Sequence, residues 1–111
     1  MYNRRPKYNA SKTIVDGIKF DSRKEAARWV KLKEAEERGE ITNLQRQVKF
    51  EIQPSFKHKG KTIRAINYFA DFVYTDKDGI IHVEDSKGFK TPEYLLKKKL
   101  LLYRGTEIEE V

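Results

Sequence analysis

The sequence has no cysteine among its 111 residues, which excludes disulfide bonds and zinc sites built on thiolates. It also has no run close to the roughly 18 consecutive apolar residues that a membrane-spanning helix needs. The first twelve residues, MYNRRPKYNASK, are charged and contain no apolar stretch, so we expect no secretory signal there. These absences favour a cytoplasmic protein that has no membrane partner.

Acidic residues are the minority charge and gather in one region of the chain. Lys and Arg number 24 against 17 Asp and Glu, which gives a net charge of +7. Residues 1–12 carry four cations and no acid, residues 46–64 carry six cations and one acid, and residues 90–104 carry five cations and one acid. Residues 65–89 instead carry five acids and two cations. Basic flanks suit a nucleic acid, although a generic basic surface with acidic turns explains the pattern equally well.

Length and composition predict one domain over residues 12–111, preceded by a flexible basic arm at residues 1–11. Asp16-Gly17 between β-branched runs predicts an N-terminal β-hairpin. A helix is expected from about Ser22 to Arg38, because Ser22 and Glu25 fit a capping box and Gly39 suits a helix end.

Three strands are then expected at residues 46–53, 66–75 and 80–87, with a polar, basic turn region at 54–61. Thr91-Pro92-Glu93 opens a second helix that runs to about Tyr103, and residues 107–111 are expected to form a last strand. This order predicts an α/β (α+β) fold with one mixed sheet and helices packed on it.

Asp71 is the first residue that suggests chemistry. It interrupts the strongly apolar strand Tyr68-Phe69-Ala70-Asp71-Phe72-Val73-Tyr74, where a carboxylate is costly to desolvate. On the next strand, a period of two places Asp85 and Lys87 on one otherwise apolar face and Glu84 on the other. The turn at 76–79 makes these strands an antiparallel pair, so Asp71 and Asp85 are expected to lie close together.

Two carboxylates this close repel each other unless a cation lies between them. Mg²⁺ takes one or two carboxylates together with waters and substrate phosphates. A metal held by Asp71 and Asp85 would polarise a phosphate and lower the pKa of a bound water, and Lys87 would orient that water or stabilise the transition state. A structural ion pair of Lys87 with either aspartate accounts for the spacing equally well.

Asp71 followed by Asp85-Ser86-Lys87-Gly88 after a hairpin turn resembles the PD-(D/E)XK motif of restriction-endonuclease-like nucleases. The core order of that family, helix, three strands, helix and strand, is the order expected here. The resemblance covers roughly residues 13–111 and implies an endonuclease that uses Mg²⁺ or Mn²⁺. The motif departs from the family in Ala70, where the name of the motif has Pro, and in Asp85, where Glu is commoner.

The same resemblance implies that Glu25, from the first helix, joins Asp71 and Asp85 as a metal ligand or acts as a base. A local capping role for Glu25 explains it as well. The implied catalytic residues are therefore Glu25, Asp71, Asp85 and Lys87.

More closely, the chain resembles small phage and prophage proteins that share a domain of unknown function. The likeness rests on these segments: Asp16 to Ser22, Gly39-Glu40-Ile41, Leu44 to Gln47, Ala70-Asp71-Phe72, Glu84 to Gly88 and Thr91 to Tyr94. More distantly it resembles phage Holliday-junction-resolving endonucleases and the transposon end-cleaving nuclease subunit. These likenesses imply branched DNA as substrate, a possible homodimer and, for a phage protein, the host cytoplasm.

Contacts to DNA are expected from the basic arm, the strand after the first helix and the second helix. The residues are Arg4, Arg5, Lys7, Gln47, Lys90, Lys97 and Lys98. The two histidines, His58 and His82, are expected at the surface, without metal-ligand spacing. The alternatives are a nuclease with another DNA target, such as nicking, packaging or host-DNA attack, a nucleic-acid-binding module without catalysis, and a protein that binds a host protein.

Overall fold

The computed structural model describes residues 13–86 and 88–111, so the predicted arm with Arg4, Arg5 and Lys7, and also Lys87, lie outside the described residues. The elements in chain order are β1 (Thr13–Val15), β2 (Ile18–Phe20), α1 (Arg23–Glu37), β3 (Ile41–Gln53), β4 (Phe56–His58), β5 (Lys61–Ile63), β6 (Ile66–Asp76), β7 (Ile81–Asp85), α2 (Pro92–Tyr103) and β8 (Ile108–Glu110). The predicted α+β class is confirmed. No described helix is long and apolar enough to cross a membrane.

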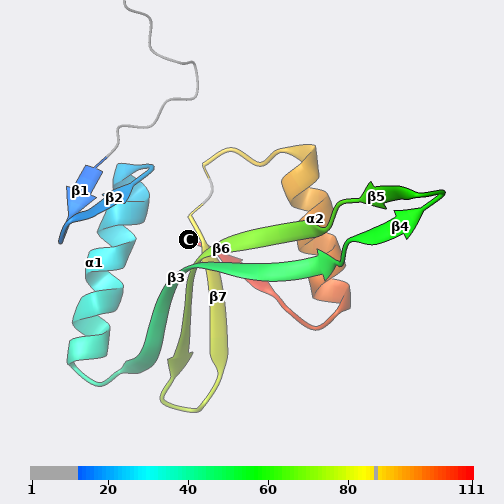
Figure 1. Cartoon of the computed structure of the whole chain (residues 1–111). Helices are drawn as coiled ribbons and strands as arrows, with labels where there is room; N and C mark the ends of the chain where they lie inside the picture. The colour runs from blue at the N-terminus through cyan, green and yellow to red at the C-terminus, as the bar shows by residue number, and fades with distance from the viewer. Residues whose placement is uncertain (1–12, 87) are drawn as a thin grey trace, which may run out of the picture.

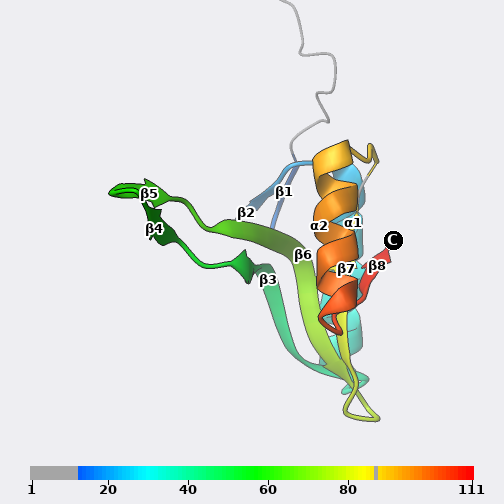
Figure 2. The same ribbon diagram turned by 90° about the vertical axis from the view of Figure 1, so that its right-hand side faces the viewer.

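The central sheet has four strands in the order β3-β6-β7-β8. β3, β6 and β7 pair in antiparallel fashion, whereas β7 and β8 are parallel, so the sheet is mixed as predicted. Figures 1 and 2 show a strongly bent sheet, with α1 beside one part of it and α2 beside another. The parallel pairing of β7 with β8 needs a crossover connection, and α2 lies in that connection.

The local signals for the first hairpin and first helix are confirmed. Asp16 and Gly17 both have positive φ, 52° and 76°, as a type I′ turn requires. The Ser22 hydroxyl accepts a 3.1 Å hydrogen bond from the backbone N–H of Glu25 and caps α1. The cap places Glu25 in the first turn of the helix, where α1 approaches the sheet.

Two boundaries predicted from the sequence are wrong. β3 begins at Ile41 rather than at residue 46, because a bulge that includes Asn43, with φ of 55°, lets pairing with β6 continue past the irregularity. Residues 54–61 were expected to be a turn region but contribute to a second hairpin, β4–β5. Its turn residues Lys59 and Gly60 have φ of 49° and 76°, and its exposed strands show no alternation of burial that could mark them.

The hydrophobic core is divided into two clusters, one beside each helix. Tyr68 and Ala70 of β6 belong to the cluster beside α2. Phe72 and Tyr74 continue the same two-residue spacing but belong to the cluster beside α1. A regular strand keeps such residues on one face. The inward face of β6 therefore changes at Asp71, which lies between the two clusters.

His82 of β7 contacts Asp76 at the end of β6 and Glu109 of β8. Its Nε2 lies 2.7 Å from Asp76 Oδ2 and its Nδ1 lies 2.7 Å from Glu109 Oε2, so the expected solitary surface histidine has two carboxylate partners. The hydrogen bond with Asp76, supported by Glu109, raises the pKa of His82 above its ordinary value of 6.5. Doubly protonated imidazole can donate to both carboxylates, whereas neutral imidazole donates to one only.

Folding stability should therefore fall as pH rises through the pKa of folded His82. The raised pKa means that the contribution of the charged ring is complete below about pH 6.5, the unfolded-state value, and disappears at higher pH. We expect the unfolding midpoint to drop by a few degrees between about pH 6 and about pH 8.5, and His82→Gln to remove that drop. Thermal unfolding followed by circular dichroism measures it. His58→Gln, at an exposed position in β4, is the control, and an unchanged pH dependence in His82→Gln would contradict the assignment.

Candidate active site

The site lies where β3 and β6 both bend. On β3, Arg46 stacks over Phe20 and Trp29 of the α1 cluster, while Val48 packs against the α2 cluster. Gln47 between them has φ of 51°, a conformation that is uncommon for a residue with a side chain. This backbone conformation breaks the alternation of the strand. The side-chain amide of Gln47 consequently reaches residues of both α1 and β6.

Polar side chains line up across the four strands at this level. Gln47 lies between the pairs Arg46–Phe72 and Val48–Ala70, which places it opposite Asp71. The β6–β7 register pairs Phe72 with Glu84, so one further step places Asp71 opposite Asp85. Asp85 in turn pairs with Glu110 of β8. Because opposite residues share a face, one polar row comprises Gln47, Asp71, Asp85 and Glu110.

Asp71 is held by the segment that follows β7. Its Oδ2 accepts 2.9 Å hydrogen bonds from both the backbone N–H and the hydroxyl of Ser86. Its Oδ1 accepts a 3.3 Å hydrogen bond from the Gln47 amide. Asp71 is half-buried, so its carboxylate is fixed from two sides and still reaches solvent. These bonds bring Asp71 next to Ser86, the residue that follows Asp85 in the chain.

Glu25 joins the same cluster from α1. Its side chain is buried, and its Oε2 accepts a 3.4 Å hydrogen bond from the Gln47 Nε2 that also donates to Asp71. Burial raises the pKa of Glu25, and the negative charges of Asp71 and Asp21 raise it further. The guanidinium of Arg46, 3.8 Å away, and the backbone of Asp21 act in the opposite direction. Glu25 therefore contacts the candidate site directly, in addition to its place in the first turn.

Asp85 is buried, with 3% of its surface exposed, and accepts a hydrogen bond from the Tyr68 hydroxyl of β6. Burial and this bond raise the pKa of Tyr68, and the charges of Asp85 and Asp71 both act on it. The same two aspartates also act on Tyr94 of α2. Asp85 thus faces the Tyr68 phenol, on the α2 side of β7.

Glu84 lies on the opposite side of β7, facing α1. Arg28 donates two hydrogen bonds to it, of 2.7 and 2.6 Å, and the Tyr74 hydroxyl donates a third. Only 1% of Glu84 is exposed. This buried ion pair joins α1 to β7. It therefore fixes the position of Glu25, on α1, relative to Asp85, on β7.

The chain matches a known protein family. A family described as "Protein of unknown function (DUF1064)" matches residues 5–111, which is nearly the whole chain. The chain belongs to the DUF1064 family. No curated protein and no solved structure matches it significantly.

Three lysines expected at DNA are neutralised locally in this DUF1064 protein. Lys90 and Lys98 lie 2.9 and 3.0 Å from the two carboxylate oxygens of Glu110, and Lys97 lies 3.0 Å from Glu93. Hydrogen bonds from Tyr94, Lys90 and Lys98 lower the pKa of Glu110 to about 2. Glu110 stands at the end of the polar row, so these cations lie beside the candidate site although they are paired.

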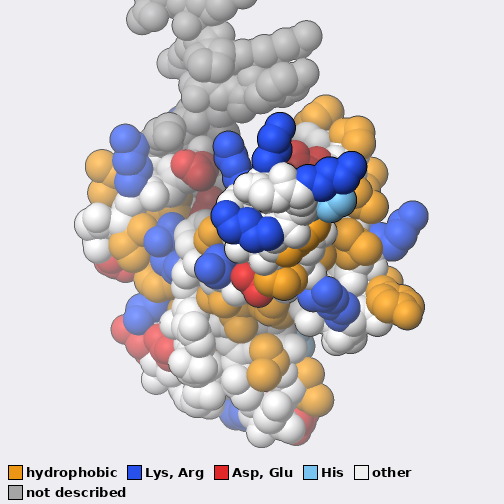
Figure 3. Space-filling model, turned by 45° about the vertical axis from the view of Figure 1, so that its right-hand side comes forward, with side chains coloured by type: hydrophobic (Ala, Val, Ile, Leu, Met, Phe, Trp, Pro, Cys, Tyr) orange, Lys and Arg blue, Asp and Glu red, His pale blue; other side chains and the backbone are white. Residues whose placement is uncertain are grey.

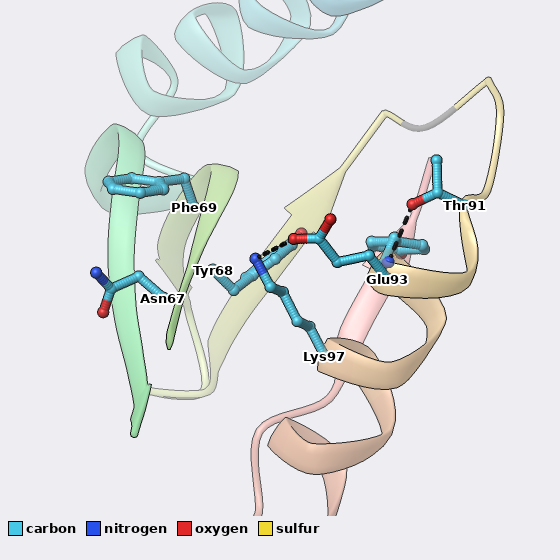
Figure 4. Close-up of a pocket in the computed structure, with 7 residues that line it drawn as sticks. Asn67, Tyr68, Phe69, Thr91, Glu93 and Lys97 are labelled. Carbon is cyan, nitrogen blue, oxygen red and sulfur yellow. Dashed lines mark hydrogen bonds and ion pairs between the residues drawn. The ribbon is translucent and has the colours of Figure 1, made fainter. Parts of the chain in front are cut away.

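A pocket of about 260 Å³ opens between β6 and the start of α2. Figure 4 shows Tyr68, Phe69 and Asn67 on one side and Thr91, Glu93 and Lys97 on the other. Tyr68 connects this pocket to Asp85, because it lines the pocket and its hydroxyl donates to that carboxylate. A group bound in this pocket would lie one side chain away from the acidic residues.

The acidic residues have the right chemistry for a hard divalent cation, since Glu25, Asp71 and Asp85 offer only carboxylate oxygens. Within residues 13–86 and 88–111, no three His, Asp or Glu side chains are gathered closely enough to form a complete cage for a metal. Mg²⁺ does not require one, because it uses one or two carboxylates and keeps several waters. Asp71 and Glu25, which accept hydrogen bonds from the same Gln47 amide, offer two neighbouring carboxylates.

Sequence reasoning missed three residues of the site. Arg46, next to Glu25, was counted only as part of a basic segment. Tyr68 stands in the sequence as one more residue of an apolar strand, and Ser86 as part of a motif. The two-residue spacing from Tyr68 to Ala70 did indicate a shared face, but nothing in the sequence marked Asp85 as the partner of Tyr68.

Proposed function

We propose that this DUF1064 protein is a Mg²⁺-dependent endonuclease with a restriction-endonuclease-like core that hydrolyses DNA phosphodiester bonds, with branched DNA as the preferred substrate. One observation carries the proposal. Carboxylates from three elements, Glu25 of α1, Asp71 of β6 and Asp85 of β7, are brought to one bend of the sheet, where Gln47 bridges two of them. The element order and the sequence Asp85-Ser86-Lys87 support the same conclusion.

A divalent cation, Mg²⁺ or Mn²⁺, held by Asp71 and Asp85 with help from Glu25, would supply the positive charge that polarises a scissile phosphate. Ser86 keeps Asp71 oriented through two hydrogen bonds. Tyr68 keeps Asp85 oriented through one. These contacts preorganise the carboxylates, so little rearrangement is needed when substrate arrives.

Glu25 is the residue that we assign to take a proton. Its raised pKa makes it a better acceptor than an ordinary glutamate, and Gln47 holds its Oε2. In hydrolysis the attacking water gives its proton to Glu25 as the new phosphorus–oxygen bond forms. The departing sugar oxygen takes a proton from water. Lys87 is assigned the remaining role of orienting the attacking water or stabilising negative charge on the phosphate.

The first test is cleavage of a labelled four-way junction and of a linear duplex with matching arms, in Mg²⁺, in Mn²⁺ and in EDTA. We expect metal-dependent cleavage, faster on the junction, and a loss on the order of 100-fold for Lys87→Ala. Lys77→Ala, at an exposed position in the β6–β7 turn, is the matched control and should cleave normally. No cleavage of either DNA with either metal would overturn the proposal in favour of a binding module without catalysis.

Symmetric cutting of a junction also implies a homodimer, because two strands must be cut by related sites. The native mass of the protein bound to a junction measures this. A strict monomer on the junction would contradict this part of the proposal, while metal-dependent cleavage would still support the nuclease.

A further inference from the structure

The β4–β5 hairpin is the most exposed and most uniformly basic element of the described chain. Every residue from Pro54 to Arg64 is exposed. No acidic residue occurs between Glu51 and Asp71. The hairpin and the segment just after it carry four cations: Lys57, Lys59, Lys61 and Arg64. Figure 3 shows Lys and Arg side chains gathered on the side of the molecule where this hairpin comes forward.

Three cations in and just before α2 are paired with acidic residues, whereas the described structure shows no such pair for the cations of the hairpin. Lys90, Lys97 and Lys98 form ion pairs with Glu110 or Glu93. Within the part of the chain that the structure describes, no carboxylate lies within ion-pairing distance of a hairpin cation, and Lys57 Nζ donates a 2.6 Å hydrogen bond to the Thr62 hydroxyl. Unneutralised cations on an exposed ribbon are available to release counterions from a polyanion.

The hairpin has its own internal order. Phe56 pairs with Ile63 and His58 with Lys61 in an antiparallel register. The Lys59-Gly60 turn has the two positive φ angles that match the twist of a two-residue hairpin. Phe56 and Ile63 remain 48% and 38% exposed, so the ribbon leaves apolar side chains uncovered. A two-stranded ribbon gains little stability alone. A twisted two-stranded ribbon of this kind fits the major groove of B-DNA, which admits an α-helix or a β-ribbon.

The position of the hairpin relative to the site suits the same DNA. β3 leads from Gln47 into the hairpin, and β6 leads back from it to Asp71 (Figures 1 and 2). At about 3.3 Å per residue, the base of the hairpin at Ile63 is at most about 26 Å from Asp71 along the chain, and its tip at Gly60 is at most about 36 Å away. One turn of B-DNA is roughly 34–36 Å. The ribbon can therefore contact the DNA backbone within one helical turn of a phosphate bound at the site.

We propose that the β4–β5 hairpin is the element that holds DNA, with its cations on phosphates and its ribbon in a groove, within one helical turn of the acidic site. The inference deepens the proposed nuclease function and rests on it for the identity of the polyanion as DNA. It shifts the main contact from the lysines of α2 to the hairpin. Binding through this element requires no metal.

The test measures binding without metal, so that it is separate from cleavage. A fluorescein-labelled duplex longer than two helical turns is titrated in EDTA, and the anisotropy is followed at salt concentrations between about 50 and 200 mM. The variant Lys57→Gln/Lys61→Gln/Arg64→Gln should lower the slope of log K against log salt by about 2 to 3, because each lost phosphate contact removes about 0.9. Affinity at about 0.1 M salt should fall on the order of 100-fold.

A matched control removes the same charge elsewhere: Arg38→Gln/Lys31→Gln/Lys77→Gln, at exposed positions of α1, its C-cap and the β6–β7 turn. It should leave the salt slope unchanged. The charge-preserving variant Lys57→Arg/Lys61→Arg/Arg64→Lys should bind like wild type, and all three variants should keep the wild-type unfolding midpoint, because the substituted side chains are exposed. This retention separates a lost contact from a lost fold.

The outcomes for the two proposals are distinguishable. An equal loss of slope in the hairpin variant and the control, or no loss in either, would overturn the hairpin inference even if the protein cleaves DNA. An absence of salt-dependent binding by wild type would also overturn it. If the hairpin variant alone loses binding while wild type cleaves nothing with either metal, the hairpin inference is supported and the nuclease proposal fails.

Discussion

Asp71→Asn is expected to lower Mg²⁺-dependent DNA cleavage about 10³-fold while DNA binding in EDTA stays equal to wild type or becomes tighter. Asparagine has nearly the shape of aspartate and keeps an oxygen that can accept the hydrogen bonds of Ser86. It removes one negative charge from the site, which weakens the cation and also removes repulsion of phosphate. Cleavage rates under single-turnover conditions, with anisotropy in EDTA, measure the two effects.

The same substitution should leave the protein as stable as wild type or more stable. The charge of Asp71 helps to raise the pKa of buried Glu25, so its removal makes ionised Glu25 less costly in the folded state. A side chain with a purely structural role would instead lose stability on substitution. The combination of lost cleavage, retained binding and retained stability is therefore the signature of a catalytic residue.

Asp78→Asn is the matched control, because Asp78 is an exposed aspartate of the β6–β7 turn. It makes the same charge change at a distance from the site. Its cleavage rate should equal that of wild type. A comparable loss in both variants would show that the net charge of the protein, and not the position of Asp71, controls the rate.

Much of the arrangement around Asp71 could be predicted because it depends on local signals. The β6–β7 turn has a short polar sequence, and this turn is enough to bring Phe72 opposite Glu84, one residue away from Asp71 and Asp85 respectively. The first hairpin followed from Asp16-Gly17, and the cap of α1 from Ser22. The mixed sheet followed from the order of elements. The restriction-endonuclease-like identity of that sheet stays a prediction.

The contacts that complete the site depend on conformations that the sequence does not mark. Gln47 reaches both Glu25 and Asp71 because its φ is positive, a conformation that sequence patterns assign to Gly or Asn rather than to Gln. The pairing of Lys90 and Lys98 with Glu110 requires α2 to lie beside the last strand, a contact between distant segments. Periodicity predicts faces of single elements and cannot predict such pairings between elements.

The β4–β5 hairpin was missed for a different physical reason. Strands are recognised by alternation, which arises because one face is buried. Both strands of this hairpin, Phe56–His58 and Lys61–Ile63, are exposed on both faces. They therefore have no alternation of buried and exposed residues that would mark them as strands. Lys59-Gly60 adopts a two-residue hairpin turn with two positive φ angles. The sequences Asp-Gly and Asn-Gly predict such a turn more strongly than Lys-Gly does.

Arg28→Ala is expected to destabilise the protein by about 3–5 kcal/mol, which makes it the most destabilising single change proposed. The substitution leaves the charge of Glu84 buried, with 1% exposure, while the Tyr74 hydroxyl still donates a hydrogen bond to it. The unfolding midpoint should fall by roughly 10–20 °C. Urea unfolding followed by tryptophan fluorescence measures the free energy, since Trp29 lies on the same helix.

The loss of stability should come from the uncompensated charge of Glu84 rather than from the missing contacts of Arg28. A double variant can distinguish these two causes. In Arg28→Met/Glu84→Gln the methionine still covers β7, and the glutamine still accepts a hydrogen bond from Tyr74 but carries no charge. We expect it to regain most of the lost stability, because buried ion pairs contribute little beyond neutral packing of the same volume. Arg38→Ala, which breaks the similar but exposed pair with Glu40, should leave the midpoint unchanged. If the double variant is as unstable as Arg28→Ala, the geometry of the guanidinium itself fixes α1 to β7, and the positions of Glu25 and Asp85 depend on it.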